Sequence, residues 1–102
     1  MSLDFALLGK NGSPEKTVSL GVDLHHRLVT TAASLGLVHF EKFVDYYEDA
    51  EIAFSELPDL ADEVAKLRPR VDSVEMRVFL DNLDRLIAHA VSEKKKLFVI
   101  AD

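Results

Sequence analysis

The stretch Leu97-Phe98-Val99-Ile100-Ala101 decides the fold of this 102-residue chain. Five apolar residues in a row predict a β-strand that is covered on both faces or lies centrally in a small sheet, because a half-exposed strand would alternate with polar residues. Such a strand needs neighbours, and the chain offers two convincing ones, residues 5–8 and 16–20. We therefore expect a three-stranded sheet that brings the two ends of the chain together.

The two neighbouring segments predict a β-hairpin near the N-terminus. Residues 5–8 are apolar, and the turn signals Asn-Gly and Ser-Pro follow them at residues 11–14. Residues 16–20 then alternate in polarity and are rich in residues that favour strands. The hairpin and the C-terminal strand together make up the predicted sheet.

Four helices are expected between the hairpin and the last strand. The first is capped by Ser19 or Gly21 and ends at Gly36, and the second runs from about His39 to Glu48. The third begins at Ser55, with Pro58 in its first turn, and ends at Pro69. Its successor is the longest: Asp72 and Glu75 resemble a capping box, and the helix runs from Ser73 to about Glu93.

The apolar positions of these segments define the predicted core. In the longest helix they recur at helical spacing, and the set is Met76, Phe79, Leu80, Leu83, Leu86, Ile87 and Ala90. In the second helix they are Phe40, Phe43, Val44 and Tyr47. Residues 50–54 are either an extended link or a short edge strand. The predicted fold class is α+β, a three-stranded sheet covered by four helices in one domain spanning residues 1–102.

The composition excludes several kinds of site. The chain has no cysteine, so disulfides, zinc–thiolate sites, iron–sulfur clusters and thiol nucleophiles are ruled out. With 48% hydrophobic and 29% charged residues it should fold without a metal or a disulfide, and we expect no cofactor. No secretory signal and no apolar run long enough to span a bilayer is visible, which indicates a soluble cytoplasmic protein.

The charge of the chain is concentrated in one stretch. Between Glu41 and Glu63 nine carboxylates stand against one lysine, a charge of −8, whereas the other 79 residues carry eleven bases and nine acids. A one-signed local field of this kind attracts cationic partners and repels nucleic acid and anionic membranes. We therefore expect a basic protein as the partner.

The histidines and the lysine run have simple structural interpretations. His25 and His26 point about 100° apart on a helix, so they are poorly placed to share a metal ion, and we interpret them as part of a solvated face. His39 and His89 are single histidines, each expected to be partly buried or on the surface. Residues 94–96 are three lysines at the end of the longest helix, where cations complement the helix dipole.

A stretch rich in acidic residues and tyrosine is the candidate partner-binding site. Tyrosine supplies large, stiff contact area with a polar tip, and carboxylates around it would steer and orient a basic partner. The alternative interpretation is the end of a helix with ordinary solvated acids. The candidate residues are Asp45, Tyr46, Tyr47, Glu48, Asp49 and Glu51.

Several segments resemble a group of small bacterial immunity proteins, which are partners of polymorphic toxins and of contact-dependent inhibition systems. These segments are Leu3-Asp4-Phe5, Val22-Asp23-Leu24-His25, Asp45-Tyr46-Tyr47-Glu48-Asp49-Ala50-Glu51-Ile52, Ser55-Glu56-Leu57 with Leu60, Glu63 and Leu67, and Leu97 to Asp102. The chain departs from the pattern at Pro58, which shortens the helix start. The resemblance implies a stoichiometric inhibitor of a toxin rather than a catalyst.

Two alternatives to the immunity-like inhibitor remain open at this point. The first is a self-associating accessory or regulatory protein, possible as a homodimer, whose exposed contact residues would be Phe40, Phe43, Tyr46 and Phe54. The second is an enzyme of unknown chemistry, which only the carboxylates and histidines support. The sequence has no phosphate-binding glycine loop and no recognisable nucleophile elbow.

Overall fold

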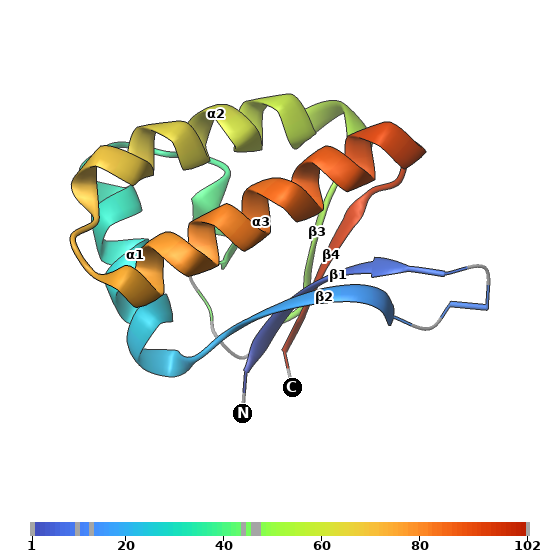
Figure 1. The fold of residues 1–102 in the computed structure, drawn as a ribbon, viewed down its shortest axis with the longest axis horizontal. Helices are drawn as coiled ribbons and strands as arrows, with labels where there is room; N and C mark the ends of the chain where they lie inside the picture. The colour runs from blue at the N-terminus through green and yellow to red at the C-terminus, as the bar shows by residue number, and fades with distance from the viewer. Residues whose placement is uncertain (1, 10, 13, 44, 46–47, 102) are drawn as a thin grey trace.

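The protein is an α+β fold built on one antiparallel sheet (Figure 1). The computed structural model describes residues 2–9, 11–12, 14–43, 45 and 48–101. In these residues four strands form the sheet, in the order β2-β1-β4-β3. The strands are β1 (Leu3–Leu8), β2 (Pro14–Leu20), β3 (Ala50–Ile52) and β4 (Leu97–Ala101). The α-helices of the described residues are α1 (Val22–Ser34), α2 (Leu57–Leu67) and α3 (Val74–Glu93).

Strand β4 lies inside the sheet, as its unbroken apolar sequence predicts. It pairs with β1, where Phe5 stands opposite Val99, and the N-terminal and C-terminal strands are thereby joined as expected. It also pairs with β3, where Ile52 stands opposite Leu97. The prediction of three strands is therefore wrong by one, because the ambiguous segment after Asp49 provides a short edge strand.

Within the described residues of 39–48, the expected helix does not form. One 3₁₀ turn, Phe40–Phe43, takes its place, so the prediction of four helices is wrong by one. A 3₁₀ turn places residues i and i+3 on the same side, which suffices to bury both Phe40 and Phe43. Helical spacing alone therefore did not separate a full helix from a single turn. Val44 and Tyr47 of the predicted stripe lie outside the described residues.

The helix ends follow the sequence signals, apart from two caps. Helix α1 begins after Gly21 and is followed by Gly36 at a φ of 68°, in the left-handed region that glycine tolerates. Ser55 lies in a 3₁₀ turn before α2 and not at its N-cap, which is Glu56. Helix α3 is capped by Ser73, whose Oγ accepts a hydrogen bond from the Met76 N–H at 3.1 Å, and not by Asp72.

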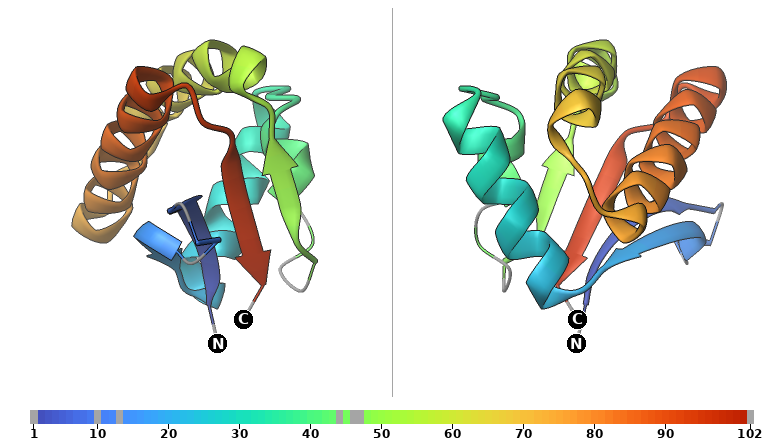
Figure 2. Two further views of the ribbon diagram at one scale, coloured as in Figure 1. Left: turned by 90° about the vertical axis from the view of Figure 1, so that its right-hand side faces the viewer. Right: turned by 60° about the vertical axis from the view of Figure 1, so that its left-hand side comes forward.

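The core lies between the sheet and the helices. All seven residues of the predicted α3 stripe are buried, which confirms the prediction. The Phe5 ring meets Phe43 and Phe79 edge-on, with centroids 5.0 and 5.7 Å apart, so the sheet, the 3₁₀ turn and α3 meet at this point. Figure 2 shows the three helices on one side of the sheet. In the part of the chain that the structure describes, no helix covers the opposite face, where Phe98 and Ile100 are half-buried.

Across the described residues, no helix combines the length and the apolar character that crossing a bilayer requires.

Candidate protein-interaction site

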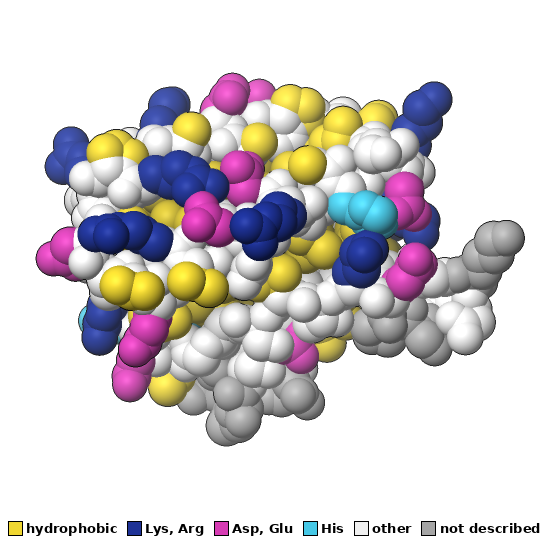
Figure 3. Space-filling model, in the orientation of Figure 1, with side chains coloured by type: hydrophobic (Ala, Val, Ile, Leu, Met, Phe, Trp, Pro, Cys, Tyr) yellow, Lys and Arg dark blue, Asp and Glu magenta, His cyan; other side chains and the backbone are white. Residues whose placement is uncertain are grey.

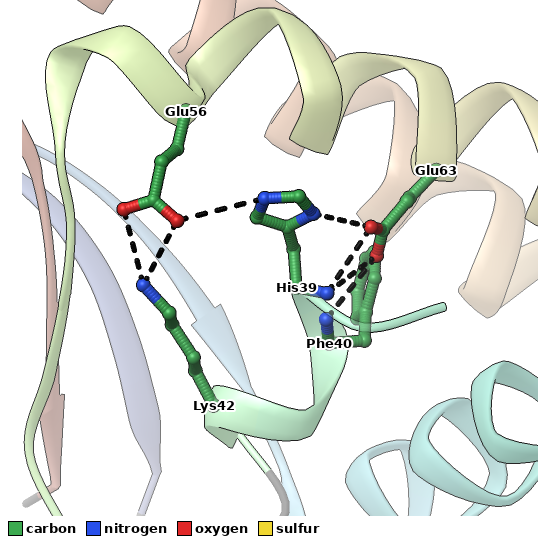
Figure 4. Close-up of polar contacts among 5 residues, drawn as sticks. All are labelled: His39, Phe40, Lys42, Glu56 and Glu63. Atoms are coloured by element: carbon green, nitrogen blue, oxygen red, sulfur yellow. Dashed lines mark hydrogen bonds and ion pairs between the residues drawn. The ribbon is translucent and has the colours of Figure 1, made fainter. Parts of the chain in front are cut away.

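The segment that leads from α1 to β3 is held at its start by a buried carboxylate from α2. Both oxygens of Glu63 accept the backbone N–H of His39 at 3.1 Å, and one accepts that of Phe40 at 3.2 Å (Figure 4). These N–H groups stand at the start of the 3₁₀ turn, where no intrahelical acceptor exists. Glu63 therefore caps this turn from a different helix. The His39 Nδ1 lies 2.5 Å from the same carboxylate.

The other end of the 3₁₀ turn is held by a histidine from α1. His25 is buried, and its Nε2 lies 2.5 Å from the carbonyl oxygen of Phe43. Because a carbonyl only accepts, this nitrogen carries the proton and donates. The interpretation of His25 as part of a solvated helix face is therefore wrong, whereas its neighbour His26 is exposed as expected.

A small ion-pair network lies beside the contacts that Glu63 and His25 make with the 3₁₀ turn. The Lys42 Nζ donates to both oxygens of Glu56 at 3.1 Å, and the His39 Nε2 lies 3.5 Å from the same carboxylate (Figure 4). The hydrogen bond from Lys42 lowers the pKa of the Glu56 carboxyl below its ordinary value. A carboxyl with a lowered pKa is ionised at neutral pH, which suits an ion pair. Part of the acidic segment is therefore matched by its own base.

The described candidate residues for partner binding lie together where the chain enters β3. We call Asp45, Glu48, Asp49 and Glu51 the acidic corner; all four are exposed. The Glu48 N–H donates to the Asp45 carbonyl at 3.4 Å, so a turn brings the first two close. An Asp49 oxygen accepts the Ala101 N–H at 2.7 Å, which fixes the corner to the end of β4. The other two candidates, Tyr46 and Tyr47, lie outside the described residues.

A hollow of about 370 Å³ opens at the acidic corner, on the edge formed by β3 and β4. Glu51 stands directly opposite Phe98 in the strand register, so both side chains lie on the face that no described helix covers. The Glu51 carboxylate is 3.5 Å from the Lys96 Nζ, which also lies 5.4 Å from the centre of the Phe98 ring. The residues that line the hollow are Asp49, Ala50, Glu51, Phe98, Val99 and Ile100.

The acidic segment as a whole does not form one continuous surface. Asp59 and Asp62 are exposed on α2, which lies at the other end of β3 from Asp49 (Figure 1). Glu63 is buried and engaged with the 3₁₀ turn. The local charge at the acidic corner is consequently smaller than the −8 of the whole segment.

The hydrophobic residues proposed for self-association divide into two groups. Phe40 and Phe43 are buried in the core, which removes them as contact residues. Phe54 is 42% exposed, and Tyr46 lies outside the described residues. Sequence reasoning missed Phe98 and Ile100 on the uncovered face. The unbroken apolar run of β4 was the available signal, since nothing in the sequence offers a second layer to cover it.

The remaining histidines are accounted for by local contacts. The His39 side chain is 16% exposed, and that of His89 is 37% exposed and pairs with Glu93. The pKa of the Glu93 carboxyl is lowered, chiefly by its hydrogen bond with Lys95. Within the described ranges, no three histidine, aspartate or glutamate side chains lie together in a way that could hold a metal ion.

Comparison of the chain with protein-family models, with curated proteins and with solved structures gave no match. The resemblance to immunity proteins therefore stays a prediction.

Proposed function

We propose that this protein is a non-catalytic binding protein, of the kind represented by bacterial immunity proteins, which holds a basic protein partner at the acidic corner. The observation that supports the proposal is the hollow beside β3, where two exposed carboxylates stand next to half-buried apolar side chains. A lysine or arginine side chain of a partner has an apolar part and a charged part, which match these two kinds of residue. Its aliphatic stem would pack on Phe98 and Ile100, and its charged end would meet Asp49 and Glu51.

The strength of such a contact comes from several weak terms acting together. An exposed ion pair contributes only about 0.2–1 kcal/mol, so one lysine in the hollow would not hold a partner. Four carboxylates on one turn and strand also accelerate association, because they steer a basic surface before contact. The proposal therefore expects binding that weakens and slows as salt rises.

Two double variants with the same change in charge test this proposal. Glu48→Gln with Asp49→Asn removes two charges from the acidic corner, and the asparagine retains an oxygen that can accept the Ala101 N–H. Asp59→Asn with Asp62→Asn removes two charges from α2 of the same acidic segment. The probe is the purified product of the neighbouring reading frame, with association rates measured by interferometry at low and high salt.

We expect the corner variant to associate several-fold more slowly at low salt and to lose much of its salt dependence, while the α2 variant stays close to the original protein. Equal rates for the two variants would contradict the proposed site. Failure of a basic neighbouring protein to bind the original chain would contradict the immunity-like function.

Self-association is a second candidate function, and the uncovered sheet face favours it. Phe98 and Ile100 lie side by side on β4 in that face, where a second copy of the chain could cover them. Sedimentation over a range of concentrations tests this. A dimer that Phe98→Glu abolishes would support it, and a monomer at every concentration would contradict it.

A further inference from the structure

The other edge of the sheet borders a second and larger hollow. Strand β2 is the outermost strand on that side, and no strand of the described residues pairs with its outer edge. A groove of about 580 Å³ lies between β2 and α3. Val18 and Leu24 line it on one side, and Val78, Phe79 and Leu86 line it on the α3 side. Figure 3 shows hydrophobic side chains in the band between the charged row of α3 and the strand below it.

The charged residues that line the groove are two bases and one acid. Lys16, Arg85 and His89 line it together with one carboxylate, Glu75. His89 pairs with Glu93 just outside the groove. In the described part of the chain, Lys16 and Arg85 form no ion pair within 4.0 Å, although the charge of Lys16 contributes to the lowered pKa of the Glu93 carboxyl.

The Arg85 guanidinium donates a hydrogen bond to the Asn82 oxygen at 3.1 Å. The guanidinium has further N–H groups to donate. Two cations therefore stand beside an apolar floor, next to a strand that has no described strand beyond its outer edge.

We propose that this groove binds an extended acidic segment of another protein, which adds a fifth strand to the outer edge of β2. In strand addition the main-chain hydrogen bonds provide affinity and alternate side chains enter pockets on one face. Apolar side chains of the added strand would lie against Val18, Val78 and Leu86 under α3. Lys16 lies two residues from Val18 and on the same face of β2, so acidic side chains on that face of the added strand would meet Lys16 and Arg85. This site is separate from the acidic corner and selects a partner of the opposite charge.

The length of β2 supports this mode of binding. The strand has seven residues, enough for several main-chain hydrogen bonds with an added strand. The chain as a whole carries −6, so the excess of cations over carboxylates in the groove lining is a local exception that favours an acidic ligand there.

The first experiment uses a short fluorescent peptide in which every second residue is valine and aspartate in turn, with threonine between them, so that both kinds of side chain face α3 in the added strand. A matched peptide has lysine in place of aspartate. Binding to the full chain is measured by fluorescence anisotropy at low salt. We expect the acidic peptide alone to bind, and Lys16→Glu or Arg85→Glu to weaken it about fivefold each. Equal binding of the two peptides, or no binding of the acidic one, would overturn the proposal.

A matched pair of valines on α3 tests the position of the site. Val78 lines the groove and is 51% exposed, whereas Val74 is 70% exposed on the same helix and does not line it. Val78→Glu should lower the affinity for the acidic peptide, and Val74→Glu should leave that affinity unchanged. Thermal melting shows whether both variants are folded. Equal affinities of the two variants would place the peptide elsewhere.

Backbone methylation distinguishes strand addition from simple docking of side chains. Two peptides are methylated on alternate amide nitrogens, one at the odd and one at the even positions. Only alternate N–H groups of an added strand face β2, so one peptide should lose binding and the other should keep it. Equal effects of the two methylations would contradict strand addition. Oligomers of the chain alone that Lys16→Glu abolishes would instead assign the edge to a second copy.

Discussion

The two edge strands of the sheet differ in length, in charge and in what holds them in place. Strand β2 has seven residues, pairs with its neighbour β1 in a hairpin, and borders a basic groove. Strand β3 has three residues, and the acidic corner lies just before it and at Glu51. Its partner β4 lies more than forty residues away in the chain. Ala101, whose N–H donates a hydrogen bond to Asp49, is equally distant in the chain.

This difference indicates two modes of recognition. A short edge strand with a charged residue at its centre resists pairing with another strand, so a partner at β3 would be recognised through side chains. The longer edge of β2 presents enough backbone for strand addition. The acidic corner also depends on tertiary contacts from α1, α2 and β4, whereas the β2 edge is held by its hairpin with β1 and by packing against α3. Mutations can therefore disturb one edge and leave the other intact.

The largest effect is expected from Glu63→Ala. The change leaves the backbone N–H groups of His39 and Phe40 without their acceptor in a buried place, which should cost about 2–4 kcal/mol of unfolding free energy. Urea denaturation measures this cost. Hydrogen exchange should accelerate in residues 40–43 and in β3, and stay unchanged in β2.

Asp62→Ala is the control for this change, because it removes the neighbouring carboxylate from the exposed side of the same helix. It should alter stability by about 0.5 kcal/mol or less. If Glu63→Ala accelerated exchange equally in β2 and β3, the two edges would not be independent and the comparison would fail.

The elements that sequence periodicity predicts well are those with long, repeated signals. The α3 stripe runs through seven buried positions, and the β4 strand is apolar throughout, so both were predictable. The structure of the segment before β3 was not predictable in this way. Its 3₁₀ turn is capped by Glu63 from α2 and by His25 from α1, and a local window of sequence contains neither contact.

The acidic residues of the candidate site were predictable from the sequence, but the apolar residues beside them were not. Local charge density picked out Asp49 and Glu51, which lie at one hollow. Phe98 and Ile100 join them through strand pairing across more than forty residues, which charge patterning does not reveal. The chain turns after β3, and this turn separates Asp59 and Asp62 on α2 from the acidic corner. Charge patterning does not reveal that separation either.

A smaller effect is expected from Lys96→Met. The lysine pairs with Glu51 and lies over the Phe98 ring, and both contacts are exposed, so their loss should cost about 1 kcal/mol or less. The variant also frees Glu51 for a partner. Binding of a basic partner at the acidic corner should therefore become tighter, while the acidic peptide at β2 binds as before. Lys66→Met on α2 is the control, and an equal gain for both variants would show that net charge alone is responsible.

The smallest effect concerns pH. Lys42 lowers the pKa of the Glu56 carboxyl from an ordinary value of 4.5, so this ion pair adds stability that is present above that pH and is lost as the pH falls through the lowered pKa. Glu56→Gln should therefore flatten the fall of stability in acid, measured by urea denaturation at neutral and acidic pH. In a Lys42→Met background the same change should flatten it much less, because the hydrogen bond that is the main cause of the shift is already absent. Equal flattening in the two backgrounds would mean that the lysine is not the cause.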